Sequence, residues 1–213
     1  MKTIDIEKWP RKEHYLRFKE YAHPYYGLTC RLNLTRFRKY QKEKNLPFFI
    51  SFLYLIVKAM NEIEEFRLRM LGDEVVLFEE IHPAFTVMTD SSVYANCFVR
   101  LAPFPEFLKN AEEIIEKTKK GLEPPKIDVH PLSVYYITCL PWIDFTSLSH
   151  PMTDDAKDSI PRIAWGKFLE ENGETYMSFS IQVNHALVDG YPCAKAFLKI
   201  QEYLNRPEQI LKL

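Results

Sequence analysis

The segment from Tyr176 to Leu204 carries the clearest pattern of apolar and polar positions in the chain. In its first half every second residue is apolar: Met177, Phe179, Ile181 and Val183. This period of two predicts a β-strand with one buried face. In its second half apolar residues return at helical spacing, which predicts an amphipathic helix. The segment is therefore expected to form a strand, a tight loop and a helix.

The loop carries the sequence His-x-x-x-Asp-Gly at residues 185–190. His185 continues the apolar series of the strand, and Asp189-Gly190 marks a turn. An imidazole titrates near neutrality and can accept a proton from a hydroxyl or a thiol, so His185 is a candidate general base. A histidine at the end of an apolar strand is more often a packed residue bonded to backbone groups. The spacing alone leaves both interpretations open.

The same reasoning divides the rest of the chain into helices and strands. Helices are predicted over residues 11–21, 36–44, 48–62 and 105–120. Strands are predicted over residues 28–34, 67–71, 74–78, 85–89, 93–101, 133–140, 160–170 and 175–184, with a short edge strand over 4–9. Residues 143–158 are predicted to form a loop, and Glu123-Pro124-Pro125 an exposed linker. This order predicts one α/β domain over residues 1–213, a two-layer sandwich in which helices cover one face of a large mixed sheet.

The charge balance and the apolar runs exclude several classes of partner. With 28 basic and 29 acidic residues the net charge is -1, so we expect neither nucleic acid nor an anionic membrane to bind by bulk charge. The most apolar run, residues 48–60, contains Lys58 and is too short to cross a bilayer. The N-terminal residues are charged and form no signal peptide. We expect a cytoplasmic protein with no membrane segment.

Cysteine, histidine and glycine usage narrows the chemistry further. The 4 cysteines and 6 histidines are scattered without metal-ligand spacing, so neither a disulfide framework nor a metal site is expected. The 6 glycines form no phosphate-binding loop, so a nucleotide-bearing substrate would need other contacts. The 15 Phe, 12 Tyr and 3 Trp suit a protein that also buries surface between subunits.

Four segments in order along the chain resemble one enzyme family. Gln182-Val183-Asn184-His185-Ala186-Leu187-Val188-Asp189-Gly190 is similar to the active-site signature of the trimeric chloramphenicol acetyltransferases. The same His-x-x-x-Asp-Gly occurs in dihydrolipoamide acyltransferases and in peptide-synthetase condensation domains. The other matching segments are residues 9–14, 85–87 and 140–147. The resemblance therefore covers nearly the whole chain.

The resemblance implies a fold, a reaction and roles for particular residues. The fold is that of the CoA-dependent acyltransferases, assembled as a homotrimer with active sites between subunits. His185 would be the base that deprotonates the hydroxyl of a small acceptor, chloramphenicol, for direct attack on acetyl-CoA, the co-substrate. Ser147 would donate a hydrogen bond to the oxyanion, and Asp189 would form a structural ion pair with Arg11. The remaining candidates are substrate-binding Arg17, Phe18, Phe145 and Asn184, and the cofactor-binding Lys167.

Several positions depart from the family pattern. Asn184 stands where the family has a second histidine, and Ala164 where it has a threonine. Arg17-Phe18 replaces a Phe-Tyr pair of the acceptor pocket, which removes a hydroxyl group. Two alternatives therefore stay open: an acetyltransferase of the same fold with a different hydroxyl acceptor, and a non-catalytic trimeric binding protein. The joint presence of Arg11, Ser147, His185 and Asp189 argues against the second.

Overall fold

The computed structural model describes residues 1–91, 93–122, 128–153 and 155–213. Its main feature is a six-stranded sheet with the strand order β2-β9-β8-β7-β5-β6. The strands are β2 (Tyr25–Asn33), β5 (His82–Met88), β6 (Tyr94–Phe98), β7 (Val134–Cys139), β8 (Arg162–Glu171) and β9 (Glu174–Asn184). β7 pairs in parallel with β5 and β8, and the other neighbours are antiparallel. The prediction of a large mixed sheet is confirmed.

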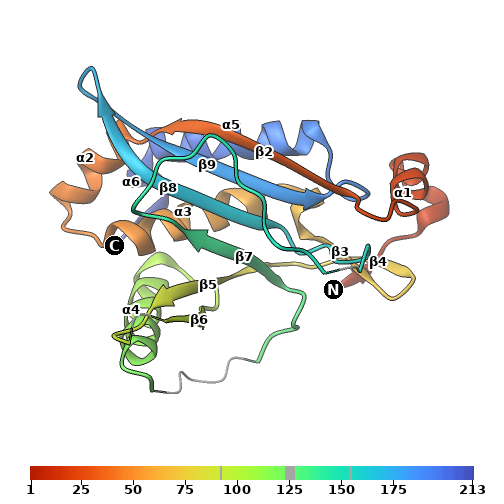
Figure 1. Ribbon diagram of the computed structural model, residues 1–213, viewed down its shortest axis with the longest axis horizontal. Helices are drawn as coiled ribbons and strands as arrows, with labels where there is room; N and C mark the ends of the chain where they lie inside the picture. The colour runs from red at the N-terminus through yellow and green to blue at the C-terminus, as the bar shows by residue number, and fades with distance from the viewer. Residues whose placement is uncertain (92, 123–127, 154) are drawn as a thin grey trace.

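Helices form the second layer of the sandwich. The longer ones are α2 (Thr35–Glu43), α3 (Phe48–Asn61), α4 (Phe104–Lys119) and α5 (Gly190–Asn205). In Figure 1, α2, α3 and α5 lie behind the sheet, and α4 flanks β5 and β6. The short helix α1 (Lys12–Phe18) stands at the end of the sheet where β9 ends, and α6 (Pro207–Ile210) follows α5 (Figure 1).

Helix α3 is apolar around nearly its whole circumference because it lies between the sheet and the other helices. The Phe52 ring meets the Trp165 ring of β8 edge-on at 5.1 Å and the Phe179 ring of β9 at 6.2 Å. All three side chains are fully buried. Complete burial of a side chain of this kind contributes about 1.5–3 kcal/mol. This cluster fixes β9 against the helical layer and therefore fixes the strand that leads to His185.

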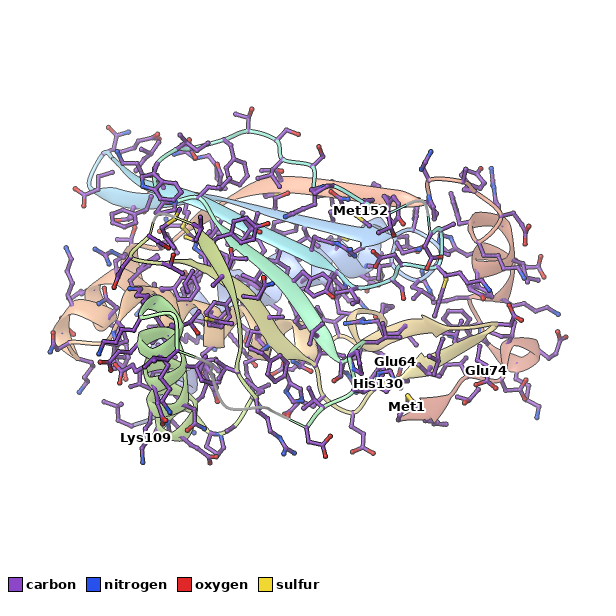
Figure 2. The ribbon with its side chains drawn as sticks, turned by 60° about the horizontal axis from the view of Figure 1, so that its bottom comes forward. Met1, Glu64, Glu74, Lys109, His130 and Met152 are labelled. Atoms are coloured by element: carbon purple, nitrogen blue, oxygen red, sulfur yellow. The ribbon has the colours of Figure 1, made fainter. Side chains whose placement is uncertain are left out.

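The prediction that β9 has only one buried face is wrong. Its apolar residues face the helices, but Ser178, Ser180, Gln182 and Asn184 on the opposite face are buried as well. Residues 141–153 and 155–161, between β7 and β8, cross this face in front of β8 and β9 (Figure 1), and Met152 in Figure 2 marks the position of this covering segment beside the sheet. Serine, glutamine and asparagine suit this buried face because their side chains can form hydrogen bonds with the covering segment.

Two hairpins form where turn residues were predicted. β8 and β9 are joined through Asn172 and Gly173, whose φ angles of 53° and 80° match the positive values of a type I′ turn. β3 (Leu68–Leu71) and β4 (Glu74–Leu77) are joined at Gly72, which also has a positive φ. They form a second sheet with β1 (Lys2–Thr3).

The sequence prediction was less accurate at the N-terminus. Residues 4–9 form no strand; they contain the 3-10 helix η1 (Ile6–Lys8), because the Asp5 carboxylate accepts a hydrogen bond from the Glu7 backbone N–H. A second 3-10 helix, η2 (Glu64–Arg67), precedes β3. Helix α1 ends at Phe18, three residues before the predicted end. The predicted linker Glu123-Pro124-Pro125 lies outside the described residues.

In the parts of the chain that the structure describes, no helix is long and apolar enough to span a bilayer. The same residues contain no cluster of three or more potential metal ligands. All four cysteines are free thiols, and Cys30 is exposed. Burial raises the pKa of the Cys193 thiol to about 12, so this cysteine is an unreactive packed residue.

Candidate active site

The His185 imidazole lies between two aromatic rings at the end of β9. Its ring stacks on Phe18 of α1, with centroids 4.1 Å apart, and on Tyr26 of β2, with centroids 4.9 Å apart. Tyr26 is paired with Val183 in the β2–β9 register, so its ring extends from the same face of the sheet as the odd-numbered residues of β9. The two rings restrict the imidazole to one plane.

Backbone contacts fix the position of His185 as well. Its N–H donates to the Pro24 carbonyl at 2.6 Å, and its carbonyl oxygen lies 2.5 Å from His14 Nε2. The ring Nδ1 is buried and has no hydrogen-bond partner among the described residues. A substrate hydroxyl cannot reach a buried nitrogen, so Nε2 is the ring nitrogen that could take a proton.

Arg11 and Asp189 form a partly buried ion pair behind the His185 loop. Arg11 Nη2 lies 3.0 Å from Asp189 Oδ2, and Asp189 Oδ1 also caps α5 by accepting from the Tyr191 backbone N–H at 3.0 Å. Burial raises the pKa of Asp189, but the Tyr191 N–H and the Arg11 charge together outweigh it and lower the pKa below its usual value. The carboxylate is therefore ionised at neutral pH and ties α1 to the start of α5.

Variants of Asp189 separate these two contacts. Asp189→Asn keeps a good helix cap but removes the charge, so we expect a melting temperature lower by about 2–4 °C. Asp189→Ala removes both contacts and should lower the melting temperature by roughly twice as much. Thermal denaturation of both variants measures the difference. Equal melting temperatures for the two variants would show that the cap contributes nothing.

Asn184 joins the His185 loop to the covering segment. Its buried Nδ2 donates to the carbonyls of Ala156 and Asp158 at 2.8 and 3.1 Å, and its Oδ1 accepts from the Ala186 N–H at 3.0 Å. These three bonds need two donors and one acceptor on the same side chain. A carboxamide has them, whereas an imidazole ring, with two nitrogens, does not. The geometry therefore favours a role for Asn184 in positioning the loop, rather than the substrate contact expected from the sequence.

The segment that carries Ser147 lies on the other face of β9. Asp144 accepts a hydrogen bond from Ser178 at 2.6 Å, and the His150 backbone N–H donates to Gln182 at 2.9 Å. Ser147, between these two anchors, is exposed and makes no hydrogen bond within the described residues. Gln182 precedes His185 by three positions, roughly 10 Å along a strand. A single chain therefore does not bring Ser147 and His185 together.

A glycine in β8 allows the Ser147 segment to approach the sheet. A Cβ atom at Gly166 would lie 2.6 Å from the Ile143 carbonyl oxygen and 3.2 Å from the Phe145 ring. The neighbouring Lys167 N–H donates to the same Ile143 carbonyl at 2.7 Å, and the Lys167 side chain is exposed. Phe145 thus packs on β8, on the same segment as Ser147 and remote from His185 of its own chain.

Gly166→Ala is expected to displace the Ser147 segment. The added methyl group would collide with the Ile143 carbonyl, which is part of the backbone of that segment and can move only with it. Since displacement of a catalytic group by about 1 Å can cost 10²-fold, we expect kcat for the acetyl transfer that the resemblance implies to fall by roughly 10- to 100-fold. Gly27→Ala in β2 is the control, because a Cβ there meets its nearest atom at an ordinary 3.6 Å. Equal kcat values for the two variants would contradict this account of Gly166.

A concave apolar area lies between strands β5, β6 and β7 and the start of the Ser147 segment, which contributes Trp142 to it. We call the exposed residues Met88, Tyr94, Tyr136 and Trp142 the open face; their exposed fractions are 47, 73, 43 and 66%. A cavity of about 470 Å³ is lined by all four, together with Thr86 and Thr138. Its size suits a small ligand.

The structure adds His14, Pro24 and Tyr26 to the site residues predicted from the sequence. These residues have no special spacing: Pro24 and Tyr26 reach His185 through the pairing of β2 with β9, and His14 reaches it through the packing of α1. Phe18 stacks on His185, whereas Arg17 beside it is exposed, with its guanidinium 5.6 Å from the centre of the Phe18 ring; the substrate contacts of both residues stay predictions. Ala164 is buried in β8.

Two solved structures share this fold. A chloramphenicol acetyltransferase structure superposes with a TM-score of 0.83 at 24% identity and covers 94% of this chain and 98% of its own. The cubic core of a pyruvate dehydrogenase multienzyme complex superposes with a TM-score of 0.68 at 18% identity, covering 93% of this chain and 88% of its own. Together with the histidine at the strand end, this likeness defines the fold class as that of the CoA-dependent acyltransferases.

The sequence comparisons define the family. The family model described as chloramphenicol acetyltransferase matches residues 1–201. A chloramphenicol acetyltransferase from Bacillus pumilus is 31% identical over 192 residues, 89% of this chain and 87% of the relative. One from Escherichia coli is 28% identical over 209 residues, 95% of this chain and 93% of the relative. The chain belongs to the chloramphenicol acetyltransferase family.

Proposed function

We propose that the protein transfers the acetyl group of acetyl-CoA to a hydroxyl group of chloramphenicol. The observation that carries the proposal is the His185 imidazole, held between Phe18 and Tyr26 with Nδ1 buried and Nε2 left to react. His185 Nε2 takes the hydroxyl proton while the hydroxyl oxygen attacks the thioester carbonyl. The tetrahedral intermediate then expels the CoA thiolate, which takes the proton back from His185 Nε2, and the products are the acetyl ester and CoA.

Ser147 is proposed to stabilise the oxyanion of that intermediate. Its hydroxyl is exposed and makes no hydrogen bond among the described residues, so it is available to donate one to the substrate oxygen. It lies in no nucleophile elbow, and we propose no acetyl-serine intermediate. Lys167 is exposed on the same side of the structure as this segment and is the candidate for a contact with acetyl-CoA.

We propose a homotrimer in which Ser147 of one subunit meets His185 of the next. Two observations support it: the two residues lie on opposite faces of β9 within one chain, and the open face exposes four large apolar side chains. Packing the open face against a neighbouring subunit would bury these side chains. The acceptor would then occupy the cavity that the open face lines.

The oligomeric state has its own test. Sedimentation velocity at micromolar concentration is expected to give a single species of three chains, each of 25.2 kDa. Replacing Met88 and Trp142 with charged residues should release monomers, because each substitution would place a charge in the buried interface. A monomeric wild-type protein at that concentration would rule out the shared site.

A second acceptor is favoured by the residues beside His185. Phe18 lacks the hydroxyl that the family pattern has there, and Arg17 places an exposed cation next to its ring. Both changes alter the acceptor side and leave His185 in place. An acetyltransferase acting on another small alcohol is therefore the alternative function.

The release of thiol from acetyl-CoA across an acceptor panel tests both functions. The panel contains chloramphenicol and small alcohols that lack its nitrophenyl ring. Saturable thiol release that depends on chloramphenicol supports the first function, and release with another alcohol alone supports the second. Binding of acetyl-CoA with no release for any acceptor would indicate a non-catalytic homologue and overturn the proposal.

The place of action is proposed from the cysteines. All four are free thiols, and burial raises the pKa of the Cys139 thiol to about 11. Free thiols suit the reducing cytoplasm, where we propose that the protein acts.

A further inference from the structure

His14 of α1 touches His185 at two places. Its Nε2 lies 2.5 Å from the His185 carbonyl oxygen, and its ring stands edge-on to the His185 ring with centroids 5.2 Å apart. Because a carbonyl can only accept, the proton of a neutral His14 must be on Nε2. The His14 ring also packs on Phe18, the residue that stacks on His185, with centroids 4.7 Å apart.

Helix α1 therefore holds the His185 loop at two points one helical turn apart. Arg11 binds Asp189 at one end of the loop, and His14 binds the His185 carbonyl at the other. Both contacts join residues more than 170 positions apart in the chain. The Pro24 carbonyl accepts from the His185 N–H, so both backbone groups of His185 are bonded to the N-terminal segment.

We propose that His14 is a positioning residue for acetyl transfer, whose Nε2–H fixes the backbone carbonyl from which the His185 imidazole is oriented. Phe18 and Tyr26 hold the plane of the imidazole, but stacking permits sliding within that plane. The bond from His14 removes this freedom by fixing the Cα atom of His185. A base must lie within hydrogen-bond reach of the hydroxyl proton, so a fixed Cα brings Nε2 to the same place in every turnover.

The electrostatic setting is consistent with a neutral donor. Burial lowers the pKa of His14, the bond to the His185 carbonyl raises it, and the Arg11 charge lowers it further. The carboxylate of Asp189 acts in the opposite direction and is already paired with Arg11. The net pKa lies below the usual value, so at neutral pH His14 adds no positive charge beside the base.

Two variants of His14 separate its hydrogen bond from its ring. His14→Phe keeps an aromatic ring against Phe18 and His185 but has no donor, and His14→Gln keeps an N–H donor without the ring. Because small misplacement of a catalytic group is costly, we expect His14→Phe to lower kcat by roughly 10- to 100-fold with unchanged KM for acetyl-CoA. His14→Gln should stay within a few-fold of the wild type. His23→Gln, at an exposed histidine, is the control.

The outcomes decide the proposal. Equal kcat values for wild type, His14→Phe and His14→Gln would overturn it, and so would equal losses in the two variants, which would assign the effect to the ring. A loss of kcat that follows a fall in melting temperature would indicate a purely structural role, so thermal denaturation accompanies the kinetics.

The kinetic part of this test rests on the proposed function, so a second readout does not depend on turnover. Iodoacetamide alkylates accessible imidazole nitrogens, and mass spectrometry of the digested protein gives the rate at His185. We expect that rate to change several-fold in His14→Phe and to keep its wild-type value in His14→Gln. If the wild type shows no transfer, the proposed function fails while alkylation still tests His14. Unchanged alkylation in both variants would overturn the positioning role.

Discussion

His185→Ala is expected to abolish nearly all acetyl transfer while leaving the binding of acetyl-CoA intact. Without the His185 imidazole the proposed general base is lost, and a neutral hydroxyl is a poor nucleophile toward a thioester. General base catalysis contributes about 10²–10⁴-fold, so kcat should fall by at least that factor. The thioester itself makes no use of the base, so its dissociation constant should not change. Thiol release and equilibrium titration with acetyl-CoA measure the two quantities.

Tyr26→Phe accompanies this variant as a control for packing. Tyr26→Phe keeps the ring that stacks on His185, so its kcat should remain near that of the wild type. Substantial transfer by His185→Ala, with the melting temperature unchanged, would contradict the assignment of His185 as the base.

Ser147→Ala is expected to lower kcat by about 10²–10³-fold with little change in either KM, the loss typical of one oxyanion donor. The bond forms only as negative charge develops on the substrate oxygen, so ground-state binding is unaffected. The melting temperature should not change, because Ser147 is exposed and makes no hydrogen bond among the described residues. Steady-state kinetics with both substrates varied, together with thermal denaturation, check all three expectations.

Mass spectrometry distinguishes this role from covalent catalysis. After mixing with acetyl-CoA alone, the wild-type protein should carry no acetyl group on Ser147. An acetylated Ser147 peptide would overturn direct transfer and make the serine a nucleophile.

Mixed trimers test whether Ser147 and His185 act across an interface. When Ser147→Ala and His185→Ala chains assemble at random in equal amounts, roughly one quarter of the interfaces pair an intact Ser147 with an intact His185. Activity of the unfractionated mixture should therefore recover to about that fraction of the wild-type value, and activity of isolated mixed trimers, in which one interface of the three pairs the intact residues, to about one third. Two different affinity tags isolate the mixed trimers. No recovery in isolated mixed trimers would place both residues in the site of one chain.

The candidate site was predicted from the sequence to different degrees. The strand, the loop and the helix around His185 follow from local rules, since a period of two, an Asp-Gly turn and helical spacing each specify one element. The hairpin at Asn172-Gly173 was also predictable, because that dipeptide suits the positive φ values of its turn. The roles of Ser147, Arg11 and Lys167 came from the resemblance and remain proposals.

The prediction failed where one part of the chain covers another. The alternation of β9 predicted a solvent-exposed polar face, but the covering segment buries it through Asp144 and His150. Nothing in the strand shows that a loop will cover it, since serine and glutamine are equally compatible with water. The substrate contact expected of Asn184 stays a prediction, but its bonds to the Ala156 and Asp158 carbonyls join segments that only folding brings together.

By itself, the sequence determined the element order, the sheet-and-helix class and the loop that carries His185, because these depend on periodicity and turn chemistry within short windows. Only the tertiary structure decided which residues surround the imidazole. Phe18, Tyr26 and His14 reach it because β2 pairs with β9 and α1 packs at the end of that pair, contacts between segments about 160–170 residues apart. The separation of Ser147 from His185 was decided in the same way, because β9 lies between them and each approaches a different face.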